Sequence, residues 1–265
     1  MNTGFPLPAM GLTELTGWLA QYLFAMLRIG AFLLASPAFG GRFLPATVRI
    51  MAGAVLALPV VATVPLPPPE ALAGLPAIPL VMAELAIGLT AGLVLTILFG
   101  AAATAGDRIA ATAGLGFAAQ IDPAAGGQTP VVAQLFGIFT LMVFLAGDGH
   151  LVAIRILLES YATFPPGSPP ALADLTAAGL TAGTGLFALA MGIMLPVVAV
   201  LLLVNFVIGV ITRSAPALNL FSFGFPLTMT ATLLLLWLTV PSMAGALEHL
   251  VETALALIGG LLATG

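Results

Sequence analysis

Long runs of apolar residues fill most of this sequence and limit its fold more than any other feature. The runs cover approximately residues 15–34, 49–64, 79–104, 131–146, 175–212 and 227–240. Hydrophobic residues make up 61% of the 265 residues and charged residues only 6%, whereas about a quarter of an ordinary soluble domain is charged. About 20 apolar residues suffice for a helix to cross the hydrocarbon core of a bilayer. The sequence therefore predicts an all-α integral membrane protein, with residues 1–265 in a single membrane domain.

Prolines mark the places where these runs are expected to bend or end. Consecutive prolines favour an extended backbone, so residues 65–70 and 164–170 are interpreted as connectors. Pro59 is expected to kink the second run, and Pro196 to kink or break the fifth, because a helical proline removes one backbone hydrogen bond. Pro241 is expected to end the sixth run and lead into a last helix.

The third run combines one carboxylate with small residues at every fourth position. The row consists of Glu84, Gly88, Gly92, Thr96, Gly100 and Thr104. This spacing indicates a single helix face, and small residues allow helices to approach closely in lipid. A buried carboxylate must be neutral or partnered, and Arg28 inside the first run is a candidate partner. Two uses of this pair are open: an inert bridge between helices, or part of a proton path.

The middle of the chain, residues 106–130, interrupts the apolar pattern. It is rich in glycine and alanine, and its charged residues are Asp107, Arg108 and Asp122. Small residues let a backbone bend and lie close to other chains. Two interpretations are open: a surface loop between two membrane helices, or a flexible segment that lines or closes a passage.

Few residues are available for catalysis or for binding a cofactor. The chain has no cysteine, and all six basic residues are arginine, which excludes thiolate metal sites, lysine Schiff bases and Walker-type phosphate loops. No hydrolase or metalloprotease fingerprint is present. His150 follows Asp148 closely, which is more typical of a helix start than of a general base. We expect no catalytic residue, no cofactor, no metal site and no nucleic-acid partner.

Several residues occur in an order that is typical of one family. They are Arg28, Pro37, Phe39, Pro45 and Arg49; Glu84, Gly88 and Gly92; Asp122, Pro123, Gly149, His150 and Ser160; and, in a late RxxPxxNxFxxGFP motif, Arg213, Pro216, Asn219, Phe221, Gly224, Phe225 and Pro226. Through these residues, over roughly 15–237, the chain resembles the FliR family of the flagellar type III export apparatus and its virulence counterparts. Ala217 stands where the family commonly has a glutamine and Thr228-Met229 where it commonly has a basic residue, so this chain lacks those polar side chains.

The resemblance implies an export gate in the bacterial inner membrane at the flagellar basal body. FliR-like proteins join FliP-like and FliQ-like subunits in a helical assembly, near FlhA-like and FlhB-like components, and unfolded protein substrates pass through it. The fold implied is a set of bent helical hairpins. Residues 15–174 would form a FliP-like part that contains a plug loop, 106–127, and residues 175–265 a FliQ-like hairpin with the C-terminal helix.

The same resemblance assigns the plug to particular residues. They are Gly106, Gly114, Leu115, Gly116, Phe117, Ile121, Asp122 and Pro123, with Gly114, Gly116 and Phe117 at the constriction. Two alternatives remain open. A secondary transporter would use Glu84 and Arg28 as a buried site, and a purely structural assembly subunit would need no plug at all.

Overall fold

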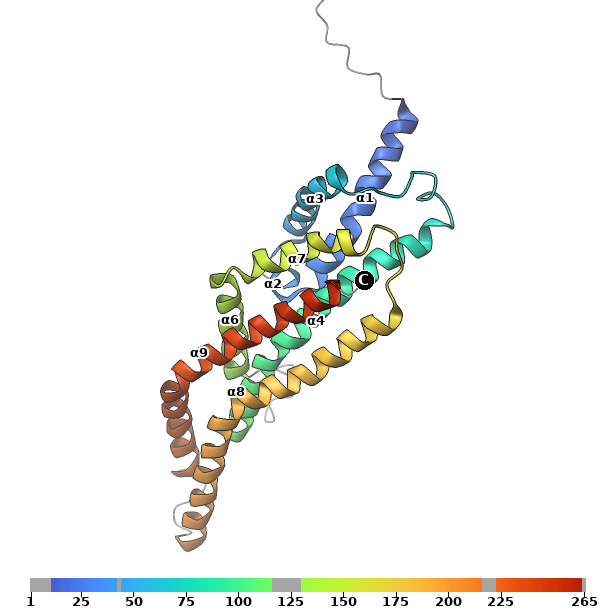
Figure 1. Cartoon of the computed structure of the whole chain (residues 1–265). Coiled ribbons are helices and arrows are strands. Elements are labelled where there is room, and N and C mark those ends of the chain that lie inside the picture. The colour runs from blue at the N-terminus through green and yellow to red at the C-terminus, as the bar shows by residue number, and fades with distance from the viewer. Residues whose placement is uncertain (1–10, 42–43, 116–129, 216–222, 264–265) are drawn as a thin grey trace, which may run out of the picture. The chain divides into compact units, whose positions relative to one another are not determined.

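The computed structural model describes residues 11–41, 44–115, 130–215 and 223–263, and every regular element in these ranges is a helix (Figure 1). The helices are α1 (Leu12–Ala35), α2 (Pro37–Gly40), α3 (Ala46–Thr63), α4 (Ala77–Thr112), α6 (Val131–Ala146), α7 (Gly149–Thr163), α8 (Leu172–Ser214) and α9 (Phe225–Ala263). Five of them are long and apolar enough to cross a membrane, and α6 with α7, bent by 68°, can form a sixth crossing. The predicted all-α integral membrane class is confirmed.

The chain divides into two compact units. The first unit comprises Met1–Leu93, Ala153–Gly179 and Ile258–Gly265, and the second comprises Val94–Val152 and Leu180–Leu257. Helices α4, α7, α8 and α9 each contribute residues to both units.

In the first unit, α1 and α3 form a helical hairpin around the short α2. Proline disfavours helical dihedral angles at the residue before it. Ser36, which precedes Pro37, is accordingly extended, with φ −80° and ψ 147°. Pro37 then begins α2, a position where its missing N–H costs nothing. Helix α3 starts after Pro45 and packs on α1 (Figure 1). The Tyr22 hydroxyl joins the two by donating to the Ala54 carbonyl at 2.7 Å.

The proline-rich connector after α3 lies against α1. The Gln21 amide donates to the Pro67 carbonyl at 2.9 Å. A Cβ placed on Gly17 would lie 2.9 Å from Cγ of Pro69, so the absence of a side chain at residue 17 lets the proline ring approach the helix. The connector predicted from its prolines is therefore held on α1 by one hydrogen bond and one close contact.

The small residues of α4 do not all serve one face. Added Cβ atoms on Gly88 and Gly92 would collide with α1: the first meets the Arg28 carbonyl, and the second lies 2.7 Å from the Ala35 Cβ. Gly100 instead faces α8 in the second unit, where an added Cβ would lie 3.4 Å from Leu186 Cδ1. Each step of four residues overshoots a full turn by about 40°, so the row winds around the helix. The expectation of one face for the whole row is wrong.

Helix α4 is longer than its apolar pattern indicates. It continues to Thr112 and includes Gly106, which the family resemblance assigned to the start of the plug loop. A Cβ on Gly106 would lie 2.7 Å from the Ala133 Cα of α6. Gly106 therefore provides close packing between two helices of the second unit, and the interruption of helical structure begins later than expected.

Three prolines lie inside helices without ending them. Pro59, Pro196 and Pro241 lie inside α3, α8 and α9 respectively, so the expected helix end at Pro241 is wrong. Figure 1 shows α8 and α9 changing direction along their lengths. A bend is the less costly solution in lipid, because ending a helix would leave more backbone groups without partners.

We predict opposite effects of alanine at two glycines in helix interiors. Gly88→Ala should lower the free energy of unfolding by about 1–3 kcal/mol, since its new methyl group meets the backbone of α1. The control Gly209→Ala, where no atom of the described residues lies within 4 Å of the added Cβ, should be neutral or stabilise by up to about 1 kcal/mol. Denaturation of the purified chain in detergent, followed by circular dichroism, measures both. Equal effects would show that α4 and α1 are not in close contact.

Candidate functional site

The first unit contains a fully buried ion pair. Arg28 of α1 and Glu84 of α4 both have side chains that are 0% exposed. The guanidinium approaches the carboxylate with two hydrogen bonds, Nε to Oε2 at 2.9 Å and Nη2 to Oε1 at 3.0 Å. This side-on, two-bond geometry is the strongest arrangement for an arginine and a carboxylate. The pair suggested by the sequence is therefore formed.

The remaining donors of Arg28 reach the end of α7. Nη1 donates to both the carbonyl and the hydroxyl oxygen of Ser160 at 3.1 Å, and Nη2 donates to the Phe164 carbonyl at 2.9 Å. The Ser160 carbonyl also accepts from the Phe164 N–H at 2.8 Å, so Arg28 gives it a second bond. The Phe164 carbonyl follows the helix end, where helical partners are missing, and Arg28 supplies one. The Ser160 hydroxyl in turn donates to Leu157 O at 2.6 Å.

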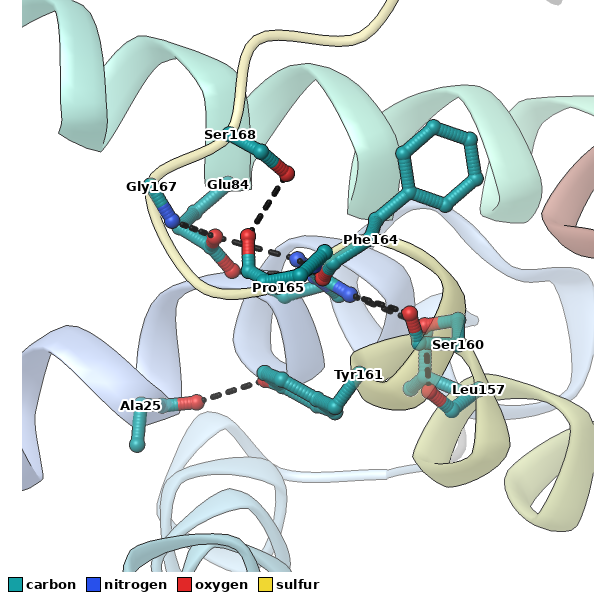
Figure 2. A network of polar contacts seen from close by, with 10 residues as sticks. Ala25, Glu84, Leu157, Ser160, Tyr161, Phe164, Pro165, Gly167 and Ser168 are labelled. Carbon is teal, nitrogen blue, oxygen red and sulfur yellow. Dashed lines mark hydrogen bonds and ion pairs between the residues drawn. The ribbon is translucent and has the colours of Figure 1, made fainter. Parts of the chain in front are cut away.

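Further contacts enclose the pair (Figure 2). The backbone N–H of Gly167 donates to Glu84 Oε1 at 2.9 Å, and Gly167 has a φ of +86°, which favours glycine. The centroid of the Tyr161 ring lies 4.1 Å from Cζ of Arg28, within cation–π range. The Tyr161 hydroxyl donates to the Ala25 carbonyl at 2.9 Å. We call Arg28, Glu84, Ser160, Tyr161, Phe164 and Gly167 the arginine network.

The arginine network leaves its cation no spare donor. A guanidinium has five N–H groups, and all five are bonded to Glu84, Ser160 or Phe164. The opposite charges neutralise one another, as burial requires. A bound anion would therefore have to displace an existing bond of Arg28. The arrangement is suited to holding α1, α4 and the end of α7 together.

Other residues singled out by the sequence lie apart from the network. Arg49 donates from Nη2 to the Leu44 carbonyl at 3.0 Å, and its buried Nε has no partner among the described residues. His150 is in the first turn of α7, and the centroid of its ring lies 6.5 Å from that of Phe144. Its buried Nδ1 has no partner in the part of the chain that the structure describes. Arg213 is exposed in the last turn of α8. Gly224 directly precedes α9, and Pro226 lies in its first turn.

Two of the predicted plug residues terminate α4. Gly114 has a φ of +82°; its N–H donates to Ala111 O at 3.1 Å, and the Leu115 N–H donates to Ala110 O at 2.9 Å. These bonds form a Schellman motif, the usual glycine-dependent helix end. The remaining plug residues and part of the late motif lie outside the described residues: Gly116, Phe117, Ile121, Asp122, Pro123, Pro216, Asn219 and Phe221.

The sequence did not indicate the backbone partners of the network. Phe164 and Gly167 act through a carbonyl and an N–H, and any residue type carries those groups. The region 164–170 was interpreted only as a proline-rich connector. The usable signal was the glycine inside that connector, since glycine between prolines marks a turn with positive φ. Tyr161 carried no signal beyond its position next to Ser160.

The helices and the buried network define an integral membrane protein whose described regular structure is entirely helical. Residues 19–254 match the model of the family described as bacterial export proteins, family 1. The chain belongs to this family.

Relatives of known name agree with this assignment. The flagellar biosynthetic protein FliR of Pectobacterium carotovorum is 32% identical over 94% of this chain and 95% of its own length. The FliR proteins of Escherichia coli K12 and Bacillus subtilis 168 are each 29% identical, over 92% and 81% of this chain and 94% and 84% of their own lengths. The FliR resemblance is confirmed. The chain is a component of the flagellar protein export apparatus, located in the bacterial inner membrane at the basal body.

We predict that the effects of removing the two charges of the arginine network on stability are not additive. Arg28→Met or Glu84→Met alone should lower the free energy of unfolding by about 3–5 kcal/mol, because each leaves an uncompensated buried charge. The double variant should cost less than the sum of the two. Denaturation in detergent measures the free energy of unfolding of the three variants.

The matched control is Arg108→Gln. The Arg108 side chain is 64% exposed, with Nε 4.0 Å from Asp107, and such a surface pair contributes at most about 1 kcal/mol. Additive effects of the two buried substitutions would contradict the coupling of Arg28 to Glu84.

Proposed function

We propose that the chain is a core subunit of the flagellar export gate and helps to form the passage for unfolded protein substrates. Its neighbours would be FliP-like and FliQ-like subunits, with FlhA-like and FlhB-like components close by. The observation that carries the proposal is the family match over residues 19–254. Five of the long apolar helices are each long enough to cross a membrane. They support the proposal because most of their exposed apolar surface must contact lipid or other subunits.

We also propose that the segment following α4 closes the passage at rest. An unfolded substrate needs a passage without sequence-specific contacts, and an ion seal needs close apolar packing that can give way. Gly116, Phe117 and Ile121 provide small and apolar side chains for such a seal. Because Gly114 and Leu115 terminate α4, the plug is proposed to begin at residue 116.

The arginine network argues against a secondary transporter. A transport site must exchange its contacts with a substrate or a proton. All five donors of Arg28 are engaged within the protein, however, and Glu84 also accepts from the Gly167 backbone. We propose that the network maintains the helix packing that subunit assembly requires.

Deleting residues 116–121 tests the plug directly. We expect the complex to assemble and to leak ions, because the helix end at Gly114 and Leu115 is retained while the proposed seal is lost. Conductance of membranes that contain the purified complex measures the leak, and the unmodified complex is the control. Unchanged conductance with intact assembly would favour the purely structural subunit.

Affinity purification tests the proposed assembly. The tagged chain, extracted in mild detergent, should carry FliP-like and FliQ-like membrane proteins with it, identified by mass spectrometry. The Arg28→Met variant should recover less of both, because it loosens the packing of α1, α4 and α7. Isolation of the chain alone under conditions that preserve other inner-membrane complexes would refute the proposal.

A further inference from the structure

Asn205 is a polar side chain in the most apolar part of α8. Its neighbours Leu202, Leu203, Phe206 and Val207 are all exposed apolar residues, typical of a surface covered by lipid or protein. A primary amide in such surroundings is costly unless it is hydrogen bonded. The Asn205 amide donates from Nδ2 to the carbonyl of Thr112 at 3.0 Å.

Thr112 is the last residue of α4, where carbonyls lack helical partners. Its neighbours are satisfied by the helix end itself: Ile109, Ala110 and Ala111 accept from Ala113, Leu115 and Gly114 respectively. Asn205 supplies the bond to Thr112 that this local motif does not make. The end of α4 is thus completed by a side chain from another helix.

Two contacts nearer the N-terminal ends of both helices, taken with the bond from Asn205 to Thr112, show that α8 runs parallel to α4. A Cβ on Gly185 would lie 3.0 Å from Leu98 Cδ2, and one on Gly100 would lie 3.4 Å from Leu186 Cδ1. These contacts and the bond from Asn205 to Thr112 all lie within the second unit. Pro196 lies in α8 between them, at a point where a helix can change direction. The contacts at Gly185 and Gly100 therefore do not by themselves determine where the later part of α8 meets the end of α4.

We propose that Asn205 is a positioning residue that holds the C-terminal end of α4 against α8. It sets the point and direction from which the chain leaves α4. The effect of this residue on ion conductance rests on the proposed function, because only then does the end of α4 support a seal. Without the amide, the Thr112 carbonyl has no described partner on α8, and the helix end is free to separate from it.

The absence of cysteine from the chain allows a direct test. Spin labels are attached through Ala111→Cys and Leu203→Cys, both at exposed positions, in the purified full-length complex, and their distance distribution is measured by pulsed electron paramagnetic resonance. Asn205→Leu should broaden the distribution, and the control Phe206→Leu on the same exposed stretch should leave it unchanged. An unchanged distribution in Asn205→Leu would overturn the proposal.

Asn205→Gln covers the case in which the leucine variant assembles poorly. Glutamine keeps an amide donor, so its distance distribution should stay narrow, whereas Asn205→Ala removes the donor and should broaden it. Equal breadths in these two variants would overturn the proposal. Conductance is measured separately on the same samples, and a several-fold rise in Asn205→Leu is expected. A broadened distance distribution without any rise would uphold the positioning role of Asn205 and count against the proposed seal.

Discussion

The buried pair of Arg28 and Glu84 constrains the rest of the first unit. Two charges removed from water must compensate each other and have their remaining hydrogen-bonding groups satisfied. That requirement brings α1 and α4 together at Gly88, whose missing side chain makes room for the Arg28 backbone. It also fixes the end of α7 through Ser160 and the turn that follows it.

A common rule links this network to the other long-range polar contacts. Side chains within the apolar helices donate mainly to backbone carbonyls of other segments: Gln21 to Pro67, Tyr22 to Ala54, Tyr161 to Ala25, Arg28 to Ser160 and Phe164, and Asn205 to Thr112. Three of these carbonyls, those of Pro67, Phe164 and Thr112, lie at a helix end or beside a proline, where helical partners are missing. Those of Ala25 and Ala54 lie inside α1 and α3 and accept the side-chain bond in addition to the helical one. A chain with few charged residues can therefore join its helices by using donors from side chains and acceptors from the backbone.

The sequence predicted the helical membrane class and the ion pair because both follow from the scarcity of charge. A single glutamate and a single arginine inside apolar runs have few possible partners. The sequence did not predict features that depend on exact helix geometry. The row from Glu84 to Thr104 winds around its helix, and Pro241 bends α9 without ending it. The backbone groups of Phe164 and Gly167 have no signature in residue type, so their part in the site could not be anticipated.

The separation of these contacts along the chain orders the events of membrane insertion. Synthesis delivers the N-terminal parts of a protein first. Arg28 and Glu84 are 56 positions apart, whereas Arg28 and Ser160 are 132 apart. Arg28 and Glu84 can pair as soon as α4 has been made. The other guanidinium N–H groups have no acceptor until Ser160 and Phe164 follow. We therefore expect a stage of synthesis in which Arg28 is bonded to Glu84 alone, and its remaining hydrogen bonds form only when α7 has been made.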